Sequence, residues 1–154
     1  MNYQKDYQRN IYNMECILID TDVILDFFFD RKPFSDDAAL VFSLCEKKKI
    51  KGFVTPVLFS NTYYLLRQTA HHDRVIDKLK QLLTITDVLI IDRNVVFQAL
   101  NSEFTDFEDA LQNFSAIKNG NIDAIITRNV KDYKTSKIGV FTPNNYIKTK
   151  ISSR

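Results

Sequence analysis

The amino-acid sequence predicts an α/β fold with three layers, in which helices flank a central parallel sheet of four or five strands. Short apolar runs recur along the chain between longer amphipathic segments, so strands and helices are expected to alternate. Polar residues directly follow several of these runs, as is typical where strands end at the edge of a parallel sheet. The length of 154 residues is that of one domain with one core.

The composition is that of an ordinary soluble globular protein. Hydrophobic residues make up 45% and charged residues 26% of the chain, and a net charge of +2 is too small to indicate nucleic-acid binding by bulk attraction. Cys16 and Cys45 lie in apolar patterns typical of buried, reduced thiols. We find no signal-peptide pattern and no apolar run of the roughly 20 residues that would span a bilayer. We therefore expect a cytoplasmic protein without disulfides.

One domain is expected over residues 14–146. Residues 1–13 are polar and contain several tyrosines without a helical or strand period, so they are expected to form an N-terminal tail. Residues 147–154 are expected to form a basic C-terminal tail.

Continuous apolar runs predict the strands. The run Cys16–Ile19 ends at Asp20 and is typical of a strand buried on both faces of a parallel sheet. The next strands are predicted at residues 52–54, 87–91 and 124–127. The run 138–141 predicts a short edge strand before Pro143.

Apolar faces and capping residues predict the helices between these strands. The predicted helices are residues 23–29, residues 35–49, one opening at Pro56, one from Asp73 to Leu83, residues 95–103 with Asn94 as the cap, and one from Thr105 or Asp106 to about Lys118. Gly120 is the stop signal of the last of these helices.

Polar residues after the strands predict a functional site at the carboxyl edge of the sheet, where ligands bind in open α/β folds. The candidates are Asp20, Asp22, Thr55, Asn61, Asp92, Thr127, Arg128, Asn129 and Asp132. An acidic group at residues 106–109 opens a helix whose amino end can point into the same crevice. Carboxylates gathered in this way repel one another, and Mg²⁺ or Mn²⁺ relieves that repulsion because both ions prefer oxygen ligands.

Each acid also has a purely structural interpretation. Asp106 and Asp109 have capping-box spacing, and acids in the first turn of a helix favour its dipole. Asp20 and Asp22 can cap the helix that begins at Val23, and Asp26 on that helix either supports the site or faces solvent. The sequence leaves both interpretations open.

Other chemistry finds little support. His71 and His72 are adjacent, so their side chains point in different directions and are poorly placed for one metal. Glycine-rich phosphate loops and Ser-His-Asp sets are absent from the sequence. Basic residues cluster near Lys47–Lys51 and Arg74–Lys80 and towards the C-terminus, where they fit either phosphate contacts or solvated helix faces.

The order of these motifs resembles the PIN domain family, and most closely its small prokaryotic members that are toxin components of toxin–antitoxin pairs. The resemblance is carried by Ile17–Val23, Asp106–Gln112 and Ile125–Tyr133. It implies a three-layer PIN-like fold and a metal-dependent ribonuclease, in which acids hold Mg²⁺ or Mn²⁺ and a water attacks an RNA phosphodiester. It further implies an RNA substrate, an antitoxin protein partner and a homodimer.

Site residues follow from the resemblance by position. Asp20 corresponds to the first acid of the family and Asp109 to the third, so these two are the expected metal ligands. Asn129 and Asp132 complete the expected catalytic set. Supporting roles are expected for Asp22, Asp26, Asn61, Asp106 and Thr127.

The sequence departs from the family at two acidic positions. Asn61 stands where a helix usually supplies a glutamate, and Asn129 stands where the fourth acid usually follows the Thr-Arg pair. An amide brings no charge, and the affinity of oxygen-ligand sites depends on ligand charge. Asp132, Asp106 and Asp26 are the candidates to compensate.

Three functions therefore remain open. The first is an active ribonuclease, and the second is a catalytically weakened PIN-like module that binds RNA or protein. The third is a haloacid-dehalogenase-like phosphohydrolase, which also begins with Asp-x-Asp after a first strand. The third fits poorly because Val23 and Ile24 replace the Gly-Thr that usually follows those acids.

Overall fold

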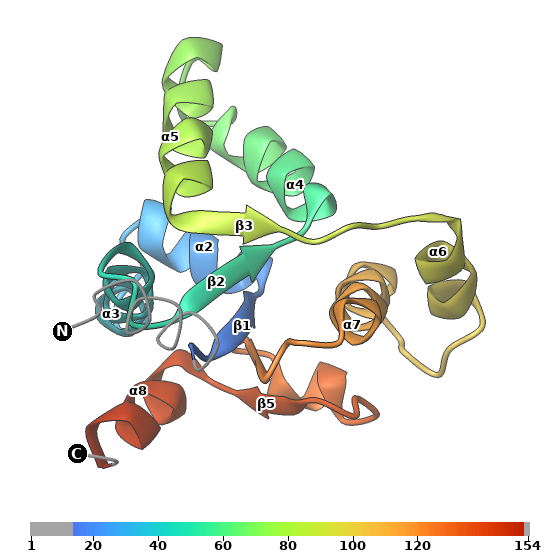
Figure 1. Cartoon of the computed structure of the whole chain (residues 1–154). Coiled ribbons are helices and arrows are strands. Elements are labelled where there is room, and N and C mark those ends of the chain that lie inside the picture. The colour runs from blue at the N-terminus through green and yellow to red at the C-terminus, as the bar shows by residue number, and fades with distance from the viewer. Residues whose placement is uncertain (1–13, 153–154) are drawn as a thin grey trace, which may run out of the picture.

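The computed structural model describes residues 14–152 and consists of one parallel sheet between two layers of helices (Figure 1). The strands are β1 (Cys16–Ile19), β2 (Lys51–Val54), β3 (Thr86–Val88), β4 (Ala124–Ile126) and β5 (Gly139–Phe141). Their order is β3-β2-β1-β4-β5, and every neighbouring pair is parallel. The predicted three-layer α/β fold is confirmed. The expected tail at residues 1–13 lies outside the described residues.

Helices connect the strands and cover both faces of the sheet. They are α2 (Thr21–Phe28), α3 (Ser35–Glu46), α4 (Pro56–Leu66), α5 (His72–Ile85), α6 (Arg93–Leu100), α7 (Phe107–Asn119) and α8 (Pro143–Ser152), with a short 3₁₀ helix at Val130–Tyr133. No helix within residues 14–152 is long and apolar enough to cross a membrane.

Alternating side chains of β1 divide the core between the two faces of the sheet. Ile17 and Ile19 are fully buried among residues of α2, α3 and α8, whereas Leu18 is buried on the opposite face with Ala116 of α7. Burying a side chain of this size stabilises a fold by about 1.5–3 kcal/mol. The strand is therefore held on both faces, as its continuous apolar run predicts.

Capping residues fix the helices that begin at the carboxyl edge. The Thr55 hydroxyl accepts a hydrogen bond from the Leu58 amide (3.3 Å), and the Asp106 carboxylate accepts one from the Asp109 amide (3.0 Å). At the other end of α7, Gly120 takes the left-handed conformation (φ 80°) that ends the helix.

Several predicted boundaries differ from the observed ones. β3 ends at Val88 rather than residue 91, because beyond the Leu89 amide, which still bonds the Val54 carbonyl, the chain leaves the edge of the sheet towards α6. Asp92 rather than Asn94 caps α6, since its carboxylate accepts from the Val95 amide at 3.0 Å. The predicted helix 35–49 ends at Glu46 because Lys48 adopts a positive φ.

The C-terminal region is helical rather than a tail from residue 147. Pro143 is suited to the first position of α8, and the Thr142 hydroxyl accepts from the Asn145 amide at 3.1 Å. Tyr146 and Ile147 are buried against the core beside α3. The basic composition hid this helix, in which Lys148 is exposed and Lys150 pairs with Glu15, because its anchoring depends on Tyr146 and Ile147.

Candidate functional site

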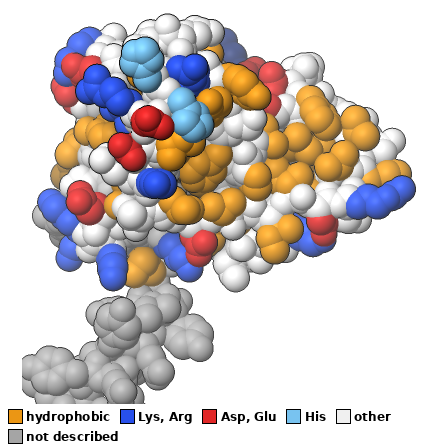
Figure 2. All heavy atoms as spheres, turned by 90° about the horizontal axis from the view of Figure 1, so that it is seen from above, with side chains coloured by type: hydrophobic (Ala, Val, Ile, Leu, Met, Phe, Trp, Pro, Cys, Tyr) orange, Lys and Arg blue, Asp and Glu red, His pale blue; other side chains and the backbone are white. Residues whose placement is uncertain are grey.

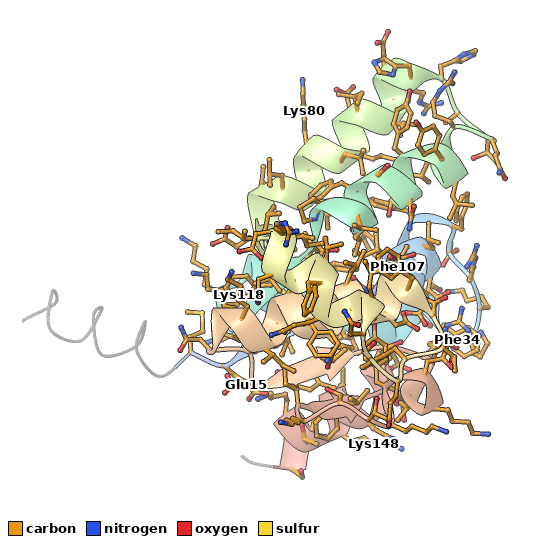
Figure 3. The ribbon with its side chains drawn as sticks, turned by 90° about the vertical axis from the view of Figure 1, so that its right-hand side faces the viewer. Glu15, Phe34, Lys80, Phe107, Lys118 and Lys148 are labelled. Atoms are coloured by element: carbon orange, nitrogen blue, oxygen red, sulfur yellow. The ribbon has the colours of Figure 1, made fainter. Side chains whose placement is uncertain are left out.

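Acidic side chains gather where β1 and β4 end and where α7 begins. Asp20 follows β1 directly and caps α2, while Thr127 follows β4 and Asp109 lies in the first turn of α7. Figure 3 shows Phe107 at the end of the molecule opposite Glu15 and Lys118, so the amino end of α7 faces the carboxyl edge of the sheet. The topology therefore unites segments that are about ninety residues apart in the chain.

Asp20 is buried and all its hydrogen-bond donors are neutral. Its Oδ1 accepts from the Thr21 amide (2.7 Å) and the Gln112 side-chain amide (2.6 Å), and its Oδ2 accepts from the Thr127 hydroxyl (2.8 Å). Burial raises the pKa of Asp20, and the hydrogen bonds from Thr127 and Gln112 oppose that rise. Neutral donors hold both oxygens of this carboxylate, and no cation pairs with it among residues 14–152.

A buried network joins Asp20 to Asp109. The Gln112 amide that donates to Asp20 also donates to the Tyr133 hydroxyl (3.2 Å), and that hydroxyl donates to Asp109 Oδ1 (3.1 Å). Gln112 and Tyr133 are almost fully buried. Burial, with the nearby charges of Asp20 and Asp106, raises the pKa of Asp109 to about 7. The two expected ligands thus share one positioning network.

Asp22 leaves one carboxylate oxygen without a partner. Its Oδ2 accepts from the Arg128 amide (3.0 Å). Its Oδ1 is buried and has no hydrogen-bond partner within the described part of the chain. Burial and the neighbouring Asp20 raise the pKa of Asp22 to about 7. Such an orphaned oxygen is unfavourable in a fold unless a ligand satisfies it.

Glu108 joins the site although the sequence pattern did not single it out. Its Oε1 accepts from the Thr21 hydroxyl and its Oε2 from the Asn61 side-chain amide, both at 2.6 Å. Burial and, after it, the Asp20 charge raise its pKa, which the bond from Thr21 opposes. Asn61, where the resemblance implies a glutamate, therefore donates directly to a carboxylate from α7. The signal was present in the acidic run 106–109, which also fitted helix capping.

The remaining predicted residues lie around this cluster in different roles. Asp132 and Asn129 are exposed, and Asp132 contributes to the raised pKa of Asp109. Asp106 is exposed and caps α7. Asp26 is fully buried but turned to Arg128, whose Nε and Nη2 bind its two oxygens at 2.5 and 3.0 Å. Asp26 is thus engaged by a cation and is not free to compensate for a missing ligand.

The donor set fits a hard divalent cation. Asp20, Asp22, Glu108 and Asp109 provide carboxylate oxygens, their pKa values are raised, and one buried oxygen of Asp22 lacks a partner. Among residues 14–152, no three His, Cys, Asp or Glu side chains converge closely enough to enclose an ion. The fit therefore rests on the chemistry of the donors rather than on a closed coordination shell.

Comparisons with solved structures show the fold that this site belongs to. The chain superimposes on the VapBC-1 structure from nontypeable Haemophilus influenzae with a TM-score of 0.62 and 10% identity, covering 84% of this chain and 98% of that one. It superimposes on VapBC2 from Rickettsia felis, bound to a DNA fragment of its promoter, with a TM-score of 0.60 and 12% identity, covering 82% of this chain and 98% of that one. With VapC20 from Mycobacterium tuberculosis, described as a toxin that cleaves the sarcin-ricin loop, the TM-score is 0.53 and the identity 20%, and the match covers 71% of this chain and 86% of that one.

The family follows from the sequence profile. No curated protein matches the chain closely enough to count as a relative. A profile of the PIN domain matches residues 16–131, which include Asp20 and Asp22 after β1 and Glu108 and Asp109 of α7. This match spans most of the chain and agrees with the resemblance inferred from the three motifs. The chain therefore belongs to the PIN domain family.

Proposed function

We propose that this protein is a metal-dependent endoribonuclease and the toxin component of a toxin–antitoxin pair. The observation that carries the proposal is the arrangement of four carboxylates from two segments, which neutral donors orient at the carboxyl edge of the sheet without bringing three of them together around one point in residues 14–152. Buried carboxylates without paired cations are unfavourable for folding, so helix capping, which accounts for Asp20 alone among the four, is not sufficient reason for the arrangement. The likeness to toxin structures such as VapC20 supports the same class of activity.

Asp20, Asp109 and Glu108 are the residues proposed to hold Mg²⁺ or Mn²⁺. When bound, the ion supplies a water that is easier to deprotonate and neutralises charge on the phosphate. Gln112 and Tyr133 keep Asp20 and Asp109 in fixed orientations through the hydrogen bonds described above. The Thr127 hydroxyl holds the second oxygen of Asp20 and so fixes the plane of that carboxylate.

Glu108 is proposed to replace the acid that position 61 lacks. The Asn61 amide lies 2.6 Å from Glu108 Oε2, so the two residues occupy one place in the site. An exchange of acid and amide between α4 and α7 keeps one carboxylate and one amide there. The total charge of the cluster is thereby preserved although Asn61 is neutral. The exchange also makes a testable variant pair, because both side chains can be swapped.

A weakened PIN-like binding module is the second candidate. The lack of three converging acids in residues 14–152 favours it, because a weakly held ion gives little catalysis. The Asn residues at 61 and 129 favour it as well. A haloacid-dehalogenase-like phosphohydrolase activity is not proposed, because the chain belongs to the PIN domain family.

An antitoxin protein and a second copy of the chain are the proposed partners. Figure 2 shows hydrophobic side chains gathered across the face seen from above, from α4 towards α6. Exposed apolar residues of these helices include Tyr64, Leu65, Phe97 and Leu100. Patches of this kind mark protein interfaces. We expect Leu100→Glu to shift the chain towards a monomer in light scattering, and an unchanged mass would exclude α6 from self-association.

Calorimetric titration with Mn²⁺ tests the metal site directly. We expect saturable binding to the wild type, loss of binding in Asp20→Asn and Asp109→Asn, and unchanged binding in the control Asp77→Asn, an exposed acid of α5. Cleavage of total RNA by the wild type, abolished by EDTA and by both site variants, then tests the activity. Undetectable Mn²⁺ binding, with or without RNA, would leave the binding-module candidate.

A further inference from the structure

A pocket beside the acids combines an aromatic ring, a guanidinium group and hydrogen-bonding side chains. It has a volume of about 300 Å³ and is lined by Phe34, Asp37, Arg128, Thr142, Pro143 and Asn144. Arg128 comes two residues after β4 and Thr142 directly follows β5. The pocket therefore lies at the carboxyl edge of the sheet, at the same end as the proposed metal site. Figure 3 shows Phe34 at the end of the molecule where Phe107 also lies.

The Arg128 guanidinium lies over the Phe34 ring and is held by Asp26. The guanidinium carbon lies 4.1 Å from the centre of the Phe34 ring. Asp26, which is fully buried, binds the guanidinium through both oxygens. Such a bidentate pair fixes the plane of the guanidinium as well as its position. Aromatic rings and guanidinium planes are the surfaces on which proteins stack unpaired RNA bases.

The side chain of Phe34 makes no capping hydrogen bond to the helix that it precedes, although its backbone carbonyl accepts from the Ala38 amide. Phe34 is the N-cap residue of α3. Ser, Thr, Asp and Asn stabilise this position because they accept a backbone hydrogen bond. The ring is also 41% exposed, so burial in the core does not explain it. The ring instead contacts the Arg128 guanidinium.

The polar groups of the pocket favour a base over a phosphate. Asp37 Oδ2 accepts a weak bond from the Asn144 amide (3.3 Å), and no hydrogen bond to Asp37 Oδ1 occurs within residues 14–152. A carboxylate repels a phosphate but accepts from N–H groups on the edge of a base. Guanine presents two adjacent donors, its ring N–H and its exocyclic amine, which match the two oxygens of a carboxylate. Adenine and cytosine present one amine on that edge, and uracil presents only a ring N–H.

One residue connects the pocket to the acids. The backbone N–H of Arg128 donates to Asp22 Oδ2 (3.0 Å), and the preceding residue, Thr127, donates to Asp20. We propose that the pocket binds one unpaired base of an RNA strand, preferentially guanine, next to the phosphodiester at the acidic site. The inference rests on the proposed ribonuclease function for its choice of RNA as the polymer.

NMR titration of the wild type with the four nucleoside 5′-monophosphates, in EDTA, tests this inference without any need for cleavage. We expect GMP to shift the backbone amide signals of Arg128 and Asn144 and to bind more tightly than UMP. Phe34→Ala should weaken GMP binding at least about fivefold through lost stacking, while Phe97→Ala, which removes an exposed ring from α6, should leave it unchanged. Asp37→Asn should reduce the preference for GMP over UMP. Inorganic phosphate should not reproduce the shifts.

The contrary results are equally specific. No shift with any nucleotide up to about 10 mM, equal binding by Phe34→Ala, or equal shifts with inorganic phosphate would each overturn the pocket assignment. RNA cleavage by a wild type that fails these titrations would leave the proposed function standing and remove only the pocket. GMP binding in the pocket of a protein that neither binds Mn²⁺ nor cleaves RNA would support the pocket and contradict the proposed ribonuclease function.

Discussion

Several acids near the two edges of the sheet differ in their partners, although Asp123 at the amino edge accepts from the Cys16 amide rather than from a cation. Near the amino edge, Glu15 pairs with Lys150 and accepts from the Tyr146 hydroxyl, and Asp87 pairs with Lys51. At the carboxyl edge, Asp20 and Asp109 are held by neutral side chains and the backbone. Asp26 is the exception there, and it positions Arg128.

Acids that are paired with cations are expected to stabilise the fold, whereas acids that are held only by neutral donors are expected to destabilise it. A cation beside a carboxylate stabilises its ionised form, which is useful at any position in a structure. Neutral donors orient a carboxylate but leave its charge available to a ligand. Active sites commonly retain such unfavourable groups, and replacing them often stabilises a protein. Opposite effects on stability are therefore expected when acids at the two edges are neutralised.

The largest effect is expected from breaking the network at the carboxyl edge. Gln112→Leu removes one of the donors to Asp20 and leaves the buried Tyr133 hydroxyl with one partner fewer. We expect a loss of about 2–4 kcal/mol in the free energy of unfolding, measured with urea. Gln98→Leu on the exposed face of α6 is the control and should change stability little. Equal stability of both variants would mean that the network does not hold the site.

Neutralising one acid at each edge is expected to give effects of opposite sign. In the metal-free protein at pH 8, Asp109→Asn should raise the free energy of unfolding by about 1–2 kcal/mol, because it removes a repelled charge and retains an acceptor for Tyr133. Glu15→Gln should lower it by about 0.5–1.5 kcal/mol. Chemical unfolding in EDTA measures both, and a destabilising Asp109→Asn would contradict the distinction between the edges.

The stabilisation by Asp109→Asn should depend on pH. The pKa of Asp109 is about 7 in the folded protein, above the value of roughly 4 expected in the unfolded chain, so between these values the folded state binds more protons. The contribution of Asp109 to stability therefore falls as pH rises from about 4 to about 7. The gain from the variant, measured in EDTA, should be small near pH 4 and fully developed above pH 7. A gain that is constant with pH would show that charge is not its cause.

The smallest effect concerns the thiols at the amino edge. Cys45 is buried against β2, where a side-chain carbon at Gly52 would lie 2.7 Å from its sulfur, and burial raises its pKa to about 12. Cys16 is half-buried, and burial raises its pKa as well. In Cys16→Ser, the remaining thiol should react with a disulfide reagent at pH 8 only after denaturation. In Cys45→Ala, the remaining thiol of Cys16 should react in the native protein, faster than the Cys45 thiol does in native Cys16→Ser. Faster reaction of Cys45 than of Cys16 would contradict the packing at Gly52.

The sequence was sufficient where local patterns decide structure. The continuous run Cys16–Ile19 is observed as β1 with the same bounds, and Gly120 ends α7 as expected. Helix α8 was missed because its lysines dominate the composition, while its anchoring depends on burial of Tyr146 and Ile147 against distant residues.

The candidate site was predictable only as a list of acids after strands. Glu108 reaches Asn61 across 47 positions and Asp26 reaches Arg128 across 102, and neither pairing follows from periodicity or capping. Gln112 lies among neutral residues and Tyr133 lies between Asp132 and Lys134, and both gain their role only from long-range contacts. Pairings of this kind require the fold to be known.

Exchange of Glu108 and Asn61 tests the central claim, that a divalent cation is bound by the carboxylates of this edge, most directly. Mn²⁺ calorimetry is carried out on the wild type, on Glu108→Gln and on the double variant Asn61→Glu with Glu108→Gln. Positions 61 and 108 together carry one carboxylate in the wild type, none in Glu108→Gln and one in the double variant. We expect saturable binding to the wild type, at least about tenfold weaker binding to Glu108→Gln, and recovered binding in the double variant. Equal binding in all three proteins would contradict the assignment of Glu108, and no binding in any of them would contradict the metal site itself.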